Sequence, residues 1–310
     1  MSLTPAELEA RRSRVGASDV ASIFGIPTFR GKNALSVWLD KTDQLEPEKR
    51  EARHLTLGNR LEPLLLDEAE SMFGPLVRNV VVFDPSGAPI ASTLDAQVIA
   101  DGRPVEAKTS GIEGPIHGSW GDADSADVPD GYYIQCQTQL LCTGAEVCEL
   151  IAILGGRGFV NFRIEPVDGV MSQIRAVTTD FFERYVQARR DPRTDWWDRL
   201  RSIHGVLCES DPCEPVLETV KRYRKIPAKV IAMDAPEQVE AVLRWQKVNA
   251  DKLAAQKAAD AAQAVVLANM GDAEAAELPG GAMLTNYETT RKGYVVNEST
   301  YRVLRMKKGK

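Results

Sequence analysis

The sequence lacks several features that mark secreted, membrane or disulfide-rich proteins. No stretch approaches the roughly 18 consecutive apolar residues that a membrane-spanning helix needs, and the N-terminal MSLTPAELEARRSR has no apolar region typical of a secretion signal. The five cysteines are odd in number and form no CxxC pair, which argues against a disulfide framework, a zinc site or an iron–sulfur cluster. We therefore expect a protein of the reducing cytoplasm, with Cys136, Cys142 and Cys148 as small buried core residues.

An excess of positive charge is also missing, since the 310 residues carry a formal net charge of −6. This does not exclude binding to nucleic acid, because the placement of the positive charges matters more than their total. A hydrophobic fraction of 44% and a charged fraction of 26% indicate a soluble globular protein. The length suggests one large domain, or one domain with a smaller appended piece, and no internal repeat is visible.

The hydrophobic pattern predicts helices and strands in alternation through about residue 190. Helices are expected at 5–14, 33–42, 58–73, 132–143 and 181–190, and strands at 77–83 and 147–154. A further short helix is expected between Ser18, as its N-cap, and Gly25, as its C-terminal glycine. This alternation predicts an α/β core over residues 1–205.

Residues 206–310 differ in character and are expected to form a C-terminal extension. We predict one or two helices over 236–270 and a small β element over 281–305. The Ala-rich stretch 250–268 either mediates subunit contacts or packs on the core. A basic cluster either follows a DNA backbone or is simply solvated; it consists of Lys221, Arg222, Arg224, Lys225 and Lys229.

A β-hairpin is expected over residues 91–109, around a two-residue Asp101-Gly102 turn of type I′. In this register Val98 pairs with Val105, Gln97 with Glu106 and Asp95 with Lys108, so the polar residues share one face. A three- or five-residue loop, or a bulge at Pro104, would move Asp95 to the opposite face.

The polar face of this hairpin has the residue types of a metal-dependent hydrolase. Two carboxylates, of Asp95 and Glu106, can hold Mg²⁺, which prefers oxygen ligands. The neighbouring Lys108 can orient or help deprotonate an attacking water and offset charge on a phosphate. The same pattern also fits an exposed hairpin with a surface salt bridge, so the surrounding segments decide between the two.

Those segments resemble the YqaJ-like viral recombinase family, to which lambda exonuclease is related, within the PD-(D/E)XK nuclease superfamily. Four blocks in the family's order carry the resemblance over roughly residues 10–190: RRSRVGASDVASIFG (11–25), LGNRLEP (57–63), ASTLDAQVIADGRPVEAK (91–108) and YYIQCQTQLLCTG (132–144). The resemblance implies an α/β fold: a PD-(D/E)XK core with a central mixed β-sheet flanked by helices, plus a helical C-terminal extension.

The resemblance also implies roles for individual residues of the catalytic centre. Asp95 and Glu106 match the metal-binding carboxylates and Lys108 the catalytic lysine. Glu62 matches a helical glutamate at the second metal position, and the carbonyl of Ala107 is an expected further ligand.

Other residues match positions around that centre. Gln135 and Gln137 match paired glutamines that contact the active centre, and we expect one of them, rather than both, to act there. Arg11 and Ser18 match residues that grip a DNA 5′-phosphate. Leu55 lies where the family places an apolar wedge between DNA strands. Asp84 falls near another family acid, but it precedes Pro85, and we read it as a turn-forming aspartate.

The implied activity is Mg²⁺-dependent 5′→3′ exonuclease digestion of linear double-stranded DNA, which leaves 3′ single strands for recombination by annealing. Two Mg²⁺ ions are expected, with Mn²⁺ as a substitute. The expected partners are DNA ends, a single-strand annealing protein and further copies of the chain in a ring-shaped trimer. The expected setting is a phage or prophage protein in bacterial cytoplasm.

Two other functions remain open, and two departures from the family are visible. A PD-(D/E)XK endonuclease of restriction or repair type would use the same residues, and a DNA-binding scaffold would use the same fold without catalysis. No tryptophan precedes Arg11, and the residues after about 205 extend beyond the matched core.

Overall fold

The computed structural model describes residues 11–26, 28, 32–46, 53–110, 120–155, 157–224, 226–227 and 229–287. The side chains of residues 53–56, 59 and 218 lie outside the described part, as does most of the helix predicted over 5–14. The chain divides into two compact units, Met1–Lys225 and Ile226–Lys310, and each is considered by itself.

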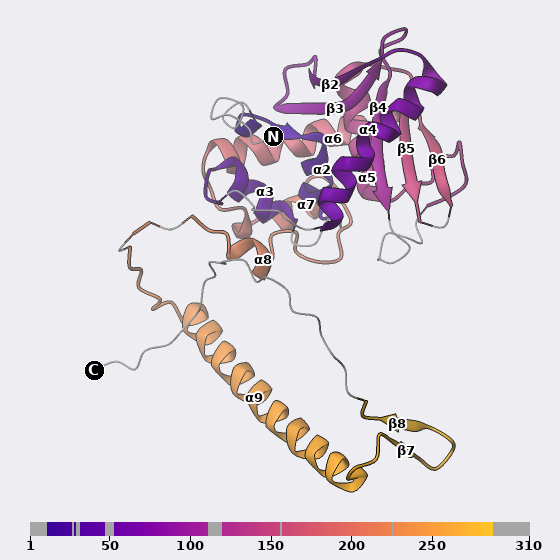
Figure 1. Cartoon of the computed structure of the whole chain (residues 1–310). Coiled ribbons are helices and arrows are strands. Elements are labelled where there is room, and N and C mark those ends of the chain that lie inside the picture. Colours follow the sequence, from indigo (N-terminus) through magenta and orange to yellow (C-terminus); the bar gives the residue numbers. More distant parts are fainter. Residues whose placement is uncertain are drawn as a thin grey trace. The chain divides into compact units, whose positions relative to one another are not determined.

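A six-stranded mixed sheet organises the first unit, with β2 and β3 lying across the direction of the other long strands (Figure 1). Its order is β1-β3-β4-β5-β6, and β2 pairs with β3. The β1–β3 and β4–β5 pairs are parallel, and the others are antiparallel. A mixed central sheet flanked by helices confirms the predicted fold class. The strands are β1 (Val15–Gly16), β2 (Leu76–Phe83), β3 (Ile90–Val98), β4 (Pro104–Ser110), β5 (Cys148–Leu154) and β6 (Gly158–Ile164).

Two long helices, α4 (Arg53–Phe73) and α5 (Asp130–Thr143), cover opposite faces of this sheet. From α4, Leu65 packs into a cluster with Val105 and Ile151. From α5, Leu140 packs into a separate cluster with Leu150. Because successive side chains of a strand point to opposite faces, Leu150 and Ile151 place the two helices on the two sides of β5.

The remaining helices of the first unit surround an aromatic core. Phe181, Tyr185 and Trp196 are fully buried, with ring centroids 4.9–5.6 Å apart. The Trp196 indole N–H donates to the carbonyl of Ile23 at 3.0 Å, which ties distant helices together. These helices are α2 (Ala17–Ile23), α3 (Ala34–Lys41), α6 (Asp168–Phe181), the π-helical turn η2 (Phe182–Gln187), the 3₁₀ turn η3 (Pro192–Thr194), α7 (Trp196–Ser202) and α8 (Leu217–Val220).

Most predicted elements form, and the exceptions have clear causes. The helix expected at 181–190 is instead the end of α6 followed by η2, because Ile174, Val177 and Phe181 form a buried helical stripe that begins upstream. Ser18 is not the N-cap of α2, which begins at Ala17 with Gly16 in the capping position. Strand β6 was not expected at all, although it pairs with the whole of β5.

The boundary between compact units falls after residue 225, later than the expected 205/206 boundary. Residues beyond 205 pack on the core: the Asn33 side chain donates to the carbonyl of Glu214 at 2.7 Å, and Cys213 is buried. Leu45 and Tyr223 form an isolated β-bridge, and Arg224 pairs with Asp43 at 2.6 Å. The assignment of the nuclease core to residues 1–205 stays a prediction about function.

The second unit contains α9 (Pro236–Met270) and a two-stranded antiparallel sheet of β7 (Ala275–Glu277) and β8 (Met283–Thr285). Helix α9 is one continuous helix of 35 residues, and none of them is buried. At 1.5 Å per residue its length is about 50 Å. The end of the expected β element at 281–305 lies outside the described residues. Across the helices described, none has the length and apolar character needed to cross a membrane.

Candidate active site at the fork between β3 and β4

Strand β3 is paired unevenly along its two edges. One edge pairs with β2 along nearly its whole length. The other edge pairs with β1 at Ile90 and Ala91, and with β4 only at Ala96 and Gln97. Within the described residues, no strand pairs with positions 92–95 on that edge, so β3 and β4 diverge at Asp95. We call this opening the fork.

The hairpin that creates the fork has a longer loop than the sequence suggested. Ala96, not Val98, pairs with Val105, so the register is shifted by two residues. A type I′ turn needs positive φ at both central residues, but of Asp101 and Gly102 only the glycine has it, at 75°. Because the shift is two residues and not one, Asp95 stays on the face of the hairpin that Glu106 occupies.

The Asp95 carboxylate fills the place that a paired strand would take. Its Oδ2 accepts the backbone N–H of Ala107 at 2.8 Å, so a side chain replaces the missing ladder hydrogen bond. Burial, and then the charge of Glu106, raise the pKa of Asp95 to about 7, and Glu62 adds to the effect. Lys108 acts in the opposite direction. The fork therefore holds more negative charge than its lysine offsets.

Glu106 and Lys108 form an ion pair on β4 at the base of the fork. Glu106 is 2% exposed and Lys108 keeps 18% of its side chain exposed. Burial alone would lower the pKa of Lys108, but Glu106 and Asp95 raise it above its ordinary value. Lys108 is thus a permanent ammonium group at neutral pH, suited to offset charge rather than to remove a proton.

Helix α5 supplies two glutamines to Glu106, and they are Gln135 and Gln139. Gln135 donates to Glu106 Oε1 at 2.6 Å, and Gln139 donates to Oε2. The prediction that Gln137 contacts the centre is wrong: its amide donates to the carbonyl of Glu165 at 2.7 Å and accepts from the N–H of Val167 at 3.0 Å. In a helix, residues four apart share a face, whereas residues two apart do not; this periodicity could have identified Gln139 from the sequence.

This difference predicts opposite effects for two neighbouring substitutions. Gln135→Ala should lower cleavage about tenfold with little loss of stability, because one carboxylate hydrogen bond at a part-exposed position is lost. Gln137→Ala should leave the cleavage rate within about twofold but lower the melting temperature, because the fully buried Gln137 side chain makes hydrogen bonds to two backbone groups that the alanine cannot make. Cleavage rates and thermal melts of the two variants check this, and equal cleavage by both would contradict it.

Glu62 lies near the fork but does not approach Asp95 and Glu106 closely. Helix α4 starts beside the end of β4, where a Cβ on Gly58 would lie 3.5 Å from Thr109 Oγ1, and Glu62 follows one turn later. Among the described residues, no three His, Cys, Asp or Glu side chains gather closely enough to hold a metal ion. Glu62 therefore does not form one tight cluster with Asp95 and Glu106.

The donor chemistry of the fork nonetheless fits a hard divalent cation. All three acidic side chains offer oxygen, which Mg²⁺ prefers. Burial, and then the charge of Glu106, raise the pKa of Asp95, and the positive charge of a bound cation would oppose both effects.

Tyr132 is a residue of the site that the sequence reasoning did not single out. The Lys108 ammonium lies 5.2 Å from the centre of its ring, a cation–π contact. Tyr132 in turn packs against Trp120, with ring centroids 5.5 Å apart. Tyr132 lies at the start of α5, one turn before Gln135, and this spacing indicates from the sequence that the two side chains share a face of the helix.

The residues predicted to grip a 5′-phosphate lie around a buried carboxylate, Asp19. The Lys32 ammonium forms a salt bridge with Asp19 at 2.9 Å and donates a hydrogen bond to the carbonyl of Ser18 at 2.7 Å. The Lys41 ammonium likewise forms a salt bridge with Asp19 at 3.1 Å and donates a hydrogen bond to the carbonyl of Arg11 at 3.1 Å. Burial would raise the pKa of Asp19, but the two ammonium groups hold it well below its ordinary value. The side chains of Arg11 and Ser18 themselves are exposed.

Two further predicted positions lie away from the fork chemistry or beyond the described part. Asp84 is buried, pairs with Arg175 at 2.7 Å and accepts the backbone N–H of Ser86, as a turn-forming aspartate does. Leu55 belongs to α4, and its side chain lies outside the described residues. The predicted burial of Cys136, Cys142 and Cys148 is confirmed.

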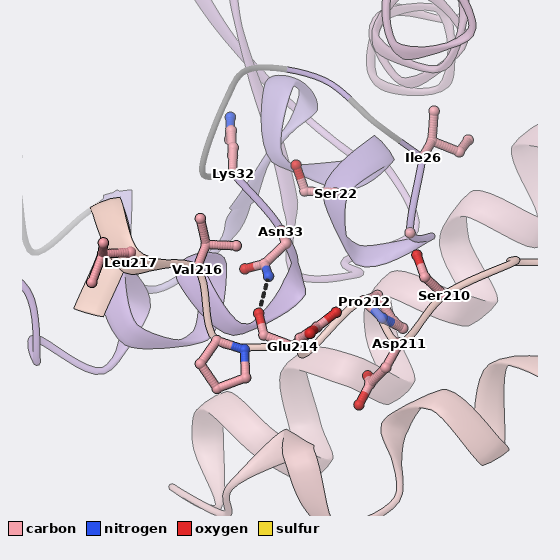
Figure 2. A pocket seen from close by; sticks show the side chains of 12 residues that line it. Ser22, Ile26, Lys32, Asn33, Ser210, Asp211, Pro212, Glu214, Val216 and Leu217 are labelled. Carbon is pink, nitrogen blue, oxygen red and sulfur yellow. Dashed lines mark hydrogen bonds between the residues drawn. The ribbon is translucent and has the colours of Figure 1, made fainter. Parts of the chain in front are cut away.

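A separate hollow of about 460 Å³ lies between α2 and the segment 210–217. Figure 2 shows Asn33 on one wall donating to the carbonyl of Glu214 on the other. Its lining contains none of the four predicted catalytic residues, so it is distinct from the fork.

Comparison with known families finds a match over the part of the chain that contains the fork. A family model described as the YqaJ-like viral recombinase domain matches residues 8–146. This stretch contains Glu62, Asp95, Glu106 and Lys108. This part of the chain is similar to the YqaJ-like viral recombinase domain. The resemblance predicted from the four sequence blocks is thereby confirmed over this stretch.

A curated relative matches part of the chain. The YqaJ protein of Bacillus subtilis (strain 168) is 26% identical over 189 residues, which are 60% of this chain and 57% of that protein. The alignment thus spans little more than half of the curated relative.

Solved structures with a similar chain path include two exonucleases. An alkaline exonuclease (LHK-Exo) from Laribacter hongkongensis has a TM-score of 0.46 and 19% identity, covering 64% of this chain and 100% of that one. A phage-related exonuclease from Haemophilus somnus 129PT has a TM-score of 0.40 and 12% identity, covering 57% of this chain and 96% of that one.

Proposed function

We propose that the protein is a metal-dependent nuclease that degrades linear double-stranded DNA from its 5′ ends and leaves 3′ single strands. The observation that carries the proposal is the fork, where Asp95, Glu106 and Lys108 converge in a YqaJ-like domain. Two carboxylates beside one ammonium group, at the edge of a buried sheet, suit hydrolysis of a phosphodiester.

The metal of this reaction would be held by Asp95, Glu106, Glu62 and the carbonyl of Ala107. Mg²⁺ is the proposed ion, with two bound and with Mn²⁺ as a substitute, because the donors are oxygen atoms. When bound, such an ion lowers the pKa of a water and stabilises charge on the phosphate oxygens.

The chain's own residues would prepare the fork for this chemistry. Lys108 would place a fixed positive charge beside the scissile phosphate, since its neighbours keep it protonated. Gln135 and Gln139 would hold the Glu106 carboxylate in one orientation. The backbone N–H of Ala107 would do the same for Asp95.

The specificity for a 5′ end is proposed to come from Arg11 and Ser18. Both side chains are exposed, and both backbones are held by lysines that pair with Asp19. Strand β1, which leads into this region, pairs with the same edge of β3 on which Asp95 lies. Ala91 and Asp95 are four positions apart along the strand, which is about 13 Å, so both features border the same opening.

A digest of three substrates, with and without a divalent ion, tests this function. With Mg²⁺, linear duplex with 5′-phosphates should be degraded, linear duplex with 5′-hydroxyls should be degraded more slowly, and covalently closed circles should remain intact. Without a divalent ion, or with a chelator, the linear duplex should survive. Cutting of the closed circle would favour an endonuclease, and binding without any cleavage would favour a scaffold.

Arg11 should account for much of the preference for phosphorylated ends. Arg11→Ala should reduce that preference about tenfold, as the loss of a charge-assisted hydrogen bond predicts. Arg12→Ala is the matched control, because Arg12 is the next residue in the chain and its guanidinium pairs with Asp43. A ring-shaped trimer and a single-strand annealing partner complete the proposal, and the mass of the protein in solution tests the first of these.

A further inference from the structure

Glu106 receives hydrogen bonds on both of its carboxylate oxygens. Lys108 and Gln135 donate to Oε1, and Gln139 donates to Oε2. Gln139 is fully buried on α5. The orientation of this one amide therefore decides whether Oε2 meets a donor or another oxygen.

The other end of the Gln139 amide contacts a thiol. Cys148 Sγ, on β5, donates to Gln139 Oε1 at 3.3 Å, and Cys148 is also fully buried. The thiol of Cys136 lies beside it, and burial and this neighbour raise the pKa of Cys148 well above its ordinary value. Cys148 thus keeps its proton and remains a donor.

We propose that Cys148 is a positioning residue, whose thiol holds the Gln139 amide so that it donates to Glu106 and keeps that carboxylate in its working orientation. This inference rests on the proposed nuclease function. The chain of contacts runs from β5 through α5 to β4, entirely inside the first unit.

The physical reason lies in the chemistry of a primary amide. Its nitrogen only donates and its oxygen only accepts. Without Cys148, the buried Oε1 would lose its donor, and an unsatisfied buried carbonyl is unfavourable. The side chain would then turn to seek another partner, and Glu106 Oε2 would lose its hydrogen bond. A serine at position 148 has a donor of nearly the same size and should replace the thiol.

Three variants separate this role from plain packing. Cys148→Ala removes the donor, and Cys148→Ser keeps one. Cys142→Ala is the matched control, because Cys142 is another buried cysteine of this region, and the thiol that donates to Gln139 is that of Cys148. We expect Cys148→Ala to lower kcat about tenfold with KM for DNA unchanged, as for a lost buried hydrogen bond. Cys148→Ser and Cys142→Ala should stay within about threefold of the wild type.

A second measurement does not depend on cleavage. In protein labelled with ¹⁵N-glutamine, the side-chain amide protons of Gln139, assigned from their loss in Gln139→Met, should exchange slowly with solvent. Slow exchange should persist in Cys148→Ser and be lost in Cys148→Ala.

Two results would overturn the inference: Cys148→Ser as impaired as Cys148→Ala, or Cys148→Ala no more impaired than Cys142→Ala in both measurements. A wild-type protein that cleaves no DNA with Mg²⁺ or Mn²⁺ would instead contradict the proposed function. The exchange measurement would still decide whether Cys148 orients Gln139.

Discussion

Replacing Lys108 with methionine is expected to lower DNA cleavage by about 10²- to 10³-fold, the usual effect of removing one group that stabilises developing charge. Methionine keeps much of the length of the lysine side chain but carries no charge. DNA binding should stay within about threefold, because one contact among many phosphate contacts is lost. Cleavage of linear duplex under saturating Mg²⁺, and binding measured with Ca²⁺ in place of Mg²⁺, check the two statements.

The same substitution should also destabilise the fold, and a second variant separates the two effects. Without the ammonium, the buried Glu106 carboxylate keeps only its two glutamine donors, and a buried charge without its partner is costly. Adding Glu106→Gln removes that charge, so Lys108→Met with Glu106→Gln should recover the melting temperature without recovering cleavage. Retention of more than a tenth of the activity by Lys108→Met would contradict the role assigned to it.

Replacing Asp95 with asparagine is expected to abolish cleavage and, at the same time, to stabilise the metal-free protein at pH 8. The pKa of Asp95 is about 7 in the folded chain and 3.8 ordinarily, so between these values the folded state binds more protons than the unfolded state. Stability contributed by this group therefore falls as the pH rises from about 4 to about 7. Asparagine can still accept the N–H of Ala107 and never takes up the charge.

The expected gain at pH 8 is about 2 kcal/mol, discounted for partial exposure of the group, or roughly 4–8 °C in melting temperature. At pH 4 the gain should vanish. Adding Mg²⁺ at pH 8 should stabilise the wild type and have a smaller effect on Asp95→Asn, because a metal ligand is lost.

Thermal melts at the two pH values, with and without Mg²⁺, provide the measurement. Asp122→Asn is the control, since it removes the same charge from an exposed loop. If Asp95→Asn were less stable than the wild type at pH 8 without metal, the surplus of negative charge at the fork would be refuted.

The stability cost at Asp95 and the permanent charge on Lys108 follow from the same arrangement. Where β3 and β4 diverge, backbone groups that a ladder would occupy are left to side chains. Polar side chains can then enter the sheet at its buried edge. The fold thus creates a place for charged groups that an unbroken sheet would exclude.

Local sequence patterns were sufficient for most of the scaffold. The stripe of Leu65 and Ala69 predicted α4, and the short apolar run of β5 predicted a buried strand, because side-chain periodicity depends only on neighbouring residues. The grouping of Asp95, Glu106 and Lys108 and the resemblance over residues 8–146 were predicted as well. The helix periodicity of α5 also indicates that Gln139, and not Gln137, lies on the same face as Gln135.

What the sequence by itself determined is the set of elements and the residue types at the site, since these follow from periodicity along the chain. Only the tertiary structure decided that β1 and β4 share one edge of β3 and leave Asp95 between them. It also decided that a thiol on β5 lies behind Gln139 on α5. The physical reason is that pairing at a sheet edge and contact across a core join segments far apart in the chain. No local sequence pattern specifies which distant segment will be the partner.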